Sequence, residues 1–327
     1  MTARTYGSAE AFKQALEQRL REATGTGGEL SRKRQLLVFD RFLARVVSSM
    51  GEAVTLKGGL ALELRVERAR TTKDIDLRLV GSAGDLLARL QAAARVDLGD
   101  YMTFGVSPDN EQPEIQNDGM LYDGLRFRAE CRLAGKIYGQ RFGVDAVFGD
   151  PMFGEPATVV ASDVLGFAGI APPTLRLYPI ETHVAEKLHA LTMPRSRPNS
   201  RVKDLPDLAL LASAQPIDAR RLRAAIDQTF GFRNTHAVPH SFPEPPPTWA
   251  APYAAMARED QLAWPALTEI TAAASTFLDP VLAGELDAQW EPTSWAWREA
   301  GRLHHHDEAV AIPDGSGREK KPSRRKR

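Results

Sequence analysis

The chain has 327 residues, of which 43% are apolar and 26% charged. This composition is ordinary for a globular protein of one large domain or two of medium size. No run approaches the roughly 18 apolar residues of a membrane span, and the first residues lack the apolar core of a secretory signal. A cytosolic protein is therefore expected. The single cysteine, Cys131, excludes an intrachain disulfide and a cysteine-based zinc site.

The charge is balanced overall but unevenly spread. Residues 318–327 carry seven basic side chains and one acidic one, which leaves 35 basic and 41 acidic residues in the remainder. A body with this acidic excess does not indicate broad affinity for nucleic acid. We expect residues 313–327 to form a disordered basic tail that aids solubility, with RNA binding by the tail as the alternative. The run His304–His306 beside it indicates incidental metal binding at most.

The first half of the chain mixes helices and strands. Apolar spacing predicts helices over 8–21, with Ser8 as N-cap, and over 30–49, with Gly51 as the stop. Alternation of apolar and polar residues predicts strands further on. The expected strands are 53–57, 74–79, 102–106, 125–133 and 142–147, the last two paired with each other, and the expected helical segments between them are 60–65 and 85–95.

After Pro172-Pro173 the pattern becomes helical, with proline-rich loops such as 239–252 in between. The expected helices are 180–193, 207–214, 218–230, 261–277 and 281–289. The predicted fold class is therefore α/β (α+β). Residues 1–160 are expected to form an α/β domain with N-terminal helices, and residues 161–312 a mostly helical domain that completes the active-site cleft.

Two short motifs carry the chemistry. Asp74 and Asp76 alternate with Ile75 in a strand, so their carboxylates project from the same face about 7 Å apart. Two carboxylates that close favour a cation between them, and Mg²⁺ takes carboxylates together with substrate phosphates. Gly58-Gly59, between a strand and a helix, allow close approach of a triphosphate. Each motif alone is also explained by a solvated strand face or a turn; together they favour metal-dependent phosphoryl or nucleotidyl transfer.

A third carboxylate is expected from a neighbouring strand. Asp145 lies among Val144, Ala146 and Val147, where an unpaired charge is costly. We interpret it as a metal ligand, with a strand-end cap as the alternative. Asp150 is the weaker candidate for the same role.

Basic groups are expected on the opposite side of the cleft. Lys187 shares a helix face with His183 and is placed to neutralise the β- and γ-phosphates. Asp204 is either an N-cap of the following helix or an active-site residue, as a partner of Lys187 or as a base for the acceptor hydroxyl. Further basic residues are expected around the same cleft: Lys57, Arg70, Arg195, Arg197, Arg201 and Lys203.

With these motifs in place, the sequence resembles the AbiEii family of nucleotidyltransferase toxins, the toxin half of type IV abortive-infection toxin–antitoxin systems, which includes mycobacterial tRNA-modifying toxins. The likeness extends over roughly residues 5–300. It is carried by the stretches Leu56–Arg65, Arg70–Leu77, Ala185–Ala190, Arg201–Leu208 and Phe242–Trp249. The sequence departs from the family at Pro206, where many members have a bulkier residue, and this leaves the start of the local helix open.

The resemblance implies a polymerase-β-like nucleotidyltransferase domain, with Mg²⁺ (or Mn²⁺) held by Asp74 and Asp76. It also implies catalytic roles for Thr72, Lys187 and Asp204, and nucleotide binding by Lys57, Gly58, Gly59, Thr72 and Lys187. The implied reaction transfers a nucleoside monophosphate from an NTP to the 3′ end of tRNA, which blocks aminoacylation. Arg70, Arg195, Arg201 and Lys203 would contact the RNA, and a cognate antitoxin is an expected partner.

Two alternatives use the same core motifs. One is an aminoglycoside-type nucleotidyltransferase that modifies a small molecule, and the other is a non-catalytic toxin that binds GTP.

Thr72 also suggests a point of control, because a phosphate or nucleotide added there would place negative charge beside Asp74.

Overall fold

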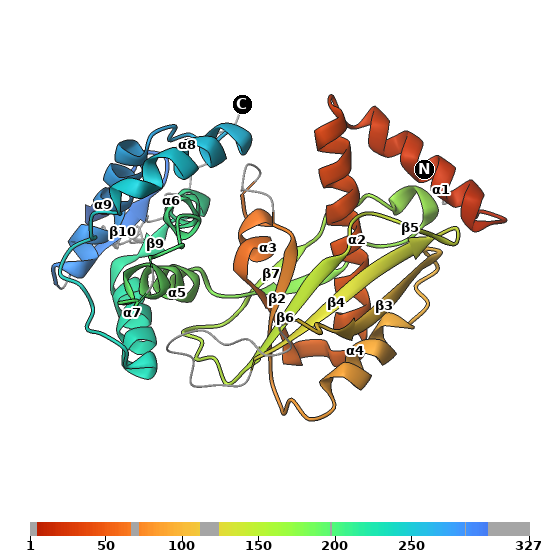
Figure 1. Ribbon diagram of the computed structural model, residues 1–327, viewed down its shortest axis with the longest axis horizontal. Coiled ribbons are helices and arrows are strands. Elements are labelled where there is room, and N and C mark those ends of the chain that lie inside the picture. The colour runs from red at the N-terminus through yellow and green to blue at the C-terminus, as the bar shows by residue number, and fades with distance from the viewer. Residues whose placement is uncertain (1–4, 67–71, 112–123, 197, 285, 300–327) are drawn as a thin grey trace, which may run out of the picture.

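The computed structural model describes residues 5–66, 72–111, 124–196, 198–284 and 286–299. Figure 1 shows two bodies side by side, one built on a sheet with helices around it and the other mostly helical. Each body has its own apolar core, and the chain passes from the first to the second near residue 178. This mixed architecture confirms the predicted α/β (α+β) fold class. The division between residues 160 and 161 stays a prediction.

The large sheet has the strand order β3-β4-β6-β2-β1-β8-β7, with the short β5 pairing β4. β2 and β6 are parallel neighbours, whereas β1–β2 and β4–β6 are antiparallel, the last as expected. β7 and β8 were not predicted. The strands are β1 Val54–Lys57, β2 Asp74–Leu79, β3 Met102–Pro108, β4 Gly124–Leu133, β5 Lys136–Ile137, β6 Phe142–Phe148, β7 Ala157–Val160 and β8 Thr174–Leu177.

Helices α1 (Ala9–Glu22), α2 (Gly27–Met50) and α4 (Leu86–Ala94) pack on this sheet in one core. Ser8 caps α1 as predicted, because its hydroxyl accepts the Ala11 N–H at 3.2 Å. The buried Cys131 belongs to this core, and burial raises the pKa of its thiol to about 12. The short α3 (Gly58–Glu63) follows β1 directly.

The second body contains α5 (Ile180–Thr192), α6 (Asp204–Ala214), α7 (Ala219–Arg233), α8 (Ala250–Glu259) and α9 (Leu267–Leu282). Two expectations were wrong here. The loop predicted over 239–252 already contains the start of α8, whose first turn tolerates Pro252. The helix predicted over 281–289 is instead the end of α9 followed by a strand. That strand, β10 (Ala288–Glu291), pairs with β9 (Ile217–Asp218) and β11 (Ala296–Glu299).

Several expectations lie outside the described residues: those for Arg70, Arg197, His304–His306 and the tail over 313–327. Within the described ranges, none of the helices has the length and apolar character that crossing a membrane requires.

Candidate active site

Four charged residues lie in one row across the large sheet. Lys57 of β1 is in register with Asp76 of β2, Asp76 with Asp145 of β6, and Asp145 with Arg126 of β4. Residues in register on adjacent strands present their side chains on the same face. The sheet therefore places two adjacent carboxylates between two flanking cations.

Two glycines make room for the pair Asp74 and Asp76. Gly58 has φ +64°, and a Cβ there would overlap the Asp76 carboxylate. Gly143, the partner of Asp74 in register, donates its N–H to Asp74 Oδ1 at 3.1 Å. A Cβ on Gly143 would come within 2.5 Å of that oxygen. Any side chain at either position would displace an aspartate, so both glycines are part of the site.

The carboxylate pair fits a divalent cation. Burial raises the pKa of Asp76 to about 6, and Asp145 adds to the rise, against the attraction of Lys57 and Lys187. No hydrogen bond or ion pair to the Asp76 carboxylate occurs within the described ranges. A hard cation at Asp74 and Asp76 would supply the missing compensation.

Asp145 has a partner of its own. Its two carboxylate oxygens accept hydrogen bonds from Arg126 at 2.8 and 2.7 Å. Among the residues that the structure describes, no group of three or more His, Cys, Asp or Glu is arranged to hold a metal ion. The structure thus places Asp145 beside Asp76, but the role of Asp145 as a metal ligand stays a prediction.

On the helical side, Lys187 of α5 is held between two carboxylates of α6. Its Nζ lies 2.8 Å from Asp204 Oδ1 and 2.7 Å from Asp207 Oδ2. Asp204 is the first residue of α6 and makes no capping hydrogen bond, so its interpretation as an N-cap is wrong. Pro206, in the first turn, is compatible with this helix start. The pairing of Lys187 with Asp204 agrees with the other interpretation of Asp204.

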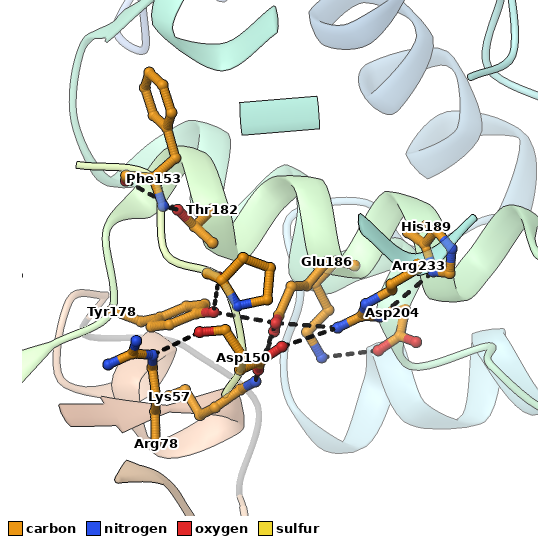
Figure 2. Close-up of polar contacts among 12 residues, drawn as sticks. Lys57, Arg78, Asp150, Phe153, Tyr178, Thr182, Glu186, His189, Asp204 and Arg233 are labelled. Carbon is orange, nitrogen blue, oxygen red and sulfur yellow. Dashed lines mark hydrogen bonds and ion pairs between the residues drawn. The ribbon is translucent and has the colours of Figure 1, made fainter. Parts of the chain in front are cut away.

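A second charged cluster joins the two bodies (Figure 2). Lys57 Nζ forms ion pairs with Asp150 and, at 3.0 Å, with Glu186 of α5. Arg233 Nη2, at the end of α7, lies 3.1 Å from Glu186 and 3.7 Å from Asp150. Burial alone would raise the pKa of Asp150, but Lys57, with smaller effects of Glu186 and Arg233, holds it below its usual value. Burial raises the pKa of Glu186 above its usual value. Asp150, the weaker candidate for the third metal ligand, is therefore a counterion of Lys57.

The carboxylates of the sheet, the Lys187–Asp204 pair, and Lys57, Glu186 and Arg233 line one cavity of about 710 Å³. Thr72 is part of its wall, and its hydroxyl donates to the Asp74 carbonyl oxygen at 3.2 Å. Apart from Asp150, the site residues expected from sequence that fall in the described ranges line this cavity: Lys57, Gly58, Gly59, Thr72, Asp74, Asp76, Asp145, Lys187, Arg195, Arg201, Lys203 and Asp204.

A family model described as "Nucleotidyl transferase AbiEii toxin, Type IV TA system" matches residues 41–300. The match takes in β1, β2, β6 and α5 to α9, and with them every wall of the cavity. The chain belongs to this family. It is thus a nucleotidyltransferase toxin of the AbiEii type, and membership of a toxin–antitoxin family implies an antitoxin partner.

Solved structures with a similar fold include MenT4, a nucleotidyltransferase toxin from Mycobacterium tuberculosis. It is 16% identical, with a TM-score of 0.49 over 86% of this chain and 92% of that chain. JHP933 from Helicobacter pylori is also 16% identical, with a TM-score of 0.38 over 60% of this chain and 78% of that chain. No curated protein matches the sequence.

The AbiEii motifs did not reveal the whole site. The sequence alone did not point to Gly143, Arg126, Glu186, Asp207 and Arg233. Asp207 and Glu186 had a local signal, because they lie within the stretches Arg201–Leu208 and Ala185–Ala190, but neither stretch by itself indicates their role. Arg126 and Arg233 had none, since only the strand register brings Arg126 to Asp145, and only the packing of α7 on α5 brings Arg233 to the cavity.

Proposed function

We propose that this AbiEii-family toxin transfers a nucleoside monophosphate from an NTP to the 3′ end of tRNA, in a Mg²⁺-dependent reaction that blocks aminoacylation. One observation carries the proposal: Asp74 and Asp76 on the sheet and the Lys187–Asp204 pair on the helices line the same cavity. Nucleotidyl transfer needs a metal-binding carboxylate pair and a cationic group for the leaving pyrophosphate around one space.

Asp74 and Asp76 would hold the metal ion, which when bound neutralises phosphate charge. Lys187 would face the β- and γ-phosphates and stabilise the charge that develops on pyrophosphate. The acceptor hydroxyl oxygen forms a bond to the α-phosphorus while the bond from the α-phosphorus to the bridging oxygen breaks. Asp204 would accept the hydroxyl proton, because its Oδ2 makes no hydrogen bond in the part of the chain that the structure describes.

Three basic side chains on the cavity wall support an RNA acceptor: Arg195, Arg201 and Lys203. All three follow α5 or precede α6, so they lie on the same side as Lys187 and Asp204. Basic side chains bind the phosphate backbone without reading base sequence. These groups would hold the phosphates of the single-stranded tRNA 3′ end beside the carboxylate pair.

The test incubates the purified chain with each of four α-labelled NTPs, Mg²⁺ and total RNA. We expect label on RNA of tRNA size, lost on omission of Mg²⁺ and in Asp74→Ala. Label on an aminoglycoside but not on RNA would favour the small-molecule alternative. Growth inhibition that survives Asp74→Ala, with no labelled product, would favour a non-catalytic GTP-binding toxin.

A further inference from the structure

A buried histidine on the cavity wall has no hydrogen-bond partner. His183 of α5 is 1% exposed and lines the same cavity as Asp76 and Lys187. Neither Nδ1 nor Nε2 has a donor or acceptor within reach among the described residues. A buried polar group without a partner is unfavourable, and such groups are uncommon in folded proteins. A ring in this state is suited to a partner that arrives with the substrate.

The surroundings of His183 favour an anionic partner. Burial lowers the pKa of the imidazole well below its ordinary value, and the cations Lys187, Arg65 and Lys57 lower it further, against the opposite effect of Asp207. The ring is therefore neutral at physiological pH and has one N–H to donate. A buried donor and nearby cations together attract phosphate oxygens.

The position of His183 indicates which phosphates it reaches. It precedes Lys187 by four residues, so the two side chains lie on the same face of α5, one turn apart. Lys187 is the group that faces the β- and γ-phosphates in the proposed reaction. We propose that His183 is a substrate-binding residue whose imidazole donates a hydrogen bond to the triphosphate, an assignment that rests on the proposed nucleotidyl transfer. This contact needs neither the base of the nucleotide nor the RNA acceptor.

Binding of inorganic tripolyphosphate with Mg²⁺, measured by calorimetry on the full chain, tests the assignment without a base, an acceptor or turnover. His183→Leu removes the donor and is expected to weaken binding roughly tenfold or more, as for a lost hydrogen bond to a charged group. Its melting temperature without ligand is expected to stay level or rise, because an unpaired polar group leaves the interior. His183→Gln keeps a donor and should retain part of the affinity. The matched control is His240→Leu, at an exposed position in a loop, which should bind as the wild type does.

Wild-type affinity in His183→Leu, or no binding of tripolyphosphate by the wild type, would overturn the assignment. So would a clear fall in melting temperature in both His183 variants, because it would show a structural partner for the ring. The labelling assay separates this failure from that of the proposed function. His183-dependent tripolyphosphate binding without transfer to RNA overturns only the transfer, and transfer with His183-independent binding overturns only the role of His183.

Discussion

Replacing Asp76 by asparagine should stabilise the protein while removing its activity. Burial and the neighbouring Asp145 carboxylate both disfavour the charged form of Asp76 and raise its pKa from 3.8 to about 6. A rise of about two pKa units corresponds to about 3 kcal/mol, the most that Asp76→Asn can gain at pH 8. We expect about 1–3 kcal/mol, a rise of several degrees in melting temperature, and loss of labelled-nucleotide transfer.

The stability gained by Asp76→Asn should depend on pH. Between pH 3.8 and 6 the folded protein keeps a proton on Asp76 that the unfolded chain has lost, so the stability contributed by this group falls as pH rises through that window. Asparagine does not titrate. The advantage of Asp76→Asn should therefore be full at pH 8 and fall to about a third at pH 4.5. The control Asp85→Asn, at an exposed aspartate, should show no such trend.

Thermal denaturation of both variants and the wild type at pH 4.5 and 8 measures this difference. At pH 8, Mg²⁺ or Mn²⁺ should raise the melting temperature of the wild type but not that of Asp76→Asn, since a ligand stabilises only the protein that binds it. An Asp76→Asn protein less stable than the wild type at pH 8, with no dependence of the difference on pH, would refute the reasoning.

Three further predictions concern single side chains. Thr72→Glu adds negative charge beside the carboxylate pair and should abolish nucleotide transfer, as a phosphate there would; incorporation of labelled NTP into tRNA measures it. Lys187→Met removes the ammonium group that pairs with the buried Asp204 and Asp207, and leaves Asp204 with Arg201 at 3.6 Å. It should cost about 3–5 kcal/mol in urea denaturation. A second substitution, Asp204→Asn, should restore part of this stability without restoring transfer. Gly58→Ala puts a side chain at φ +64° and against Asp76, and should cost about 1–3 kcal/mol and most of the activity.

Thr72→Glu and Gly58→Ala each have a matched control. Thr72→Ser keeps the hydroxyl and should remain active; a fully active Thr72→Glu would contradict the role of charge at this position. Gly231→Ala, where a Cβ meets nothing within 4 Å, should leave both stability and transfer near the wild type. Lys187→Met with unchanged stability would show that the two α6 carboxylates are compensated by another group.

The sequence predicted those parts of the site that are local in the chain. The alternation in Asp74-Ile75-Asp76 sets the face of β2, and the spacing from His183 to Lys187 sets one face of α5. These follow from the periods of a strand and a helix. The same rules predicted most helices and strands of the first body to within a few residues.

What the sequence did not predict depends on pairing between distant segments. The row from Lys57 to Arg126 exists because β2 lies beside β6, a parallel pairing that no local pattern determines. Lys57 was expected at the phosphates, but the fold brings Asp150 and Glu186 to its ammonium group. Its role in nucleotide binding stays a prediction. The start of β10 falls within the helix predicted over 281–289. Short strands and helix ends have the same apolar composition, so composition alone does not distinguish them.

The central claim is most directly tested in the cell. Sequencing of tRNA 3′ ends after brief expression should show extra nucleotides on tRNA with the wild type and none with Asp74→Ala. Growth arrest with unmodified tRNA 3′ ends would contradict the account.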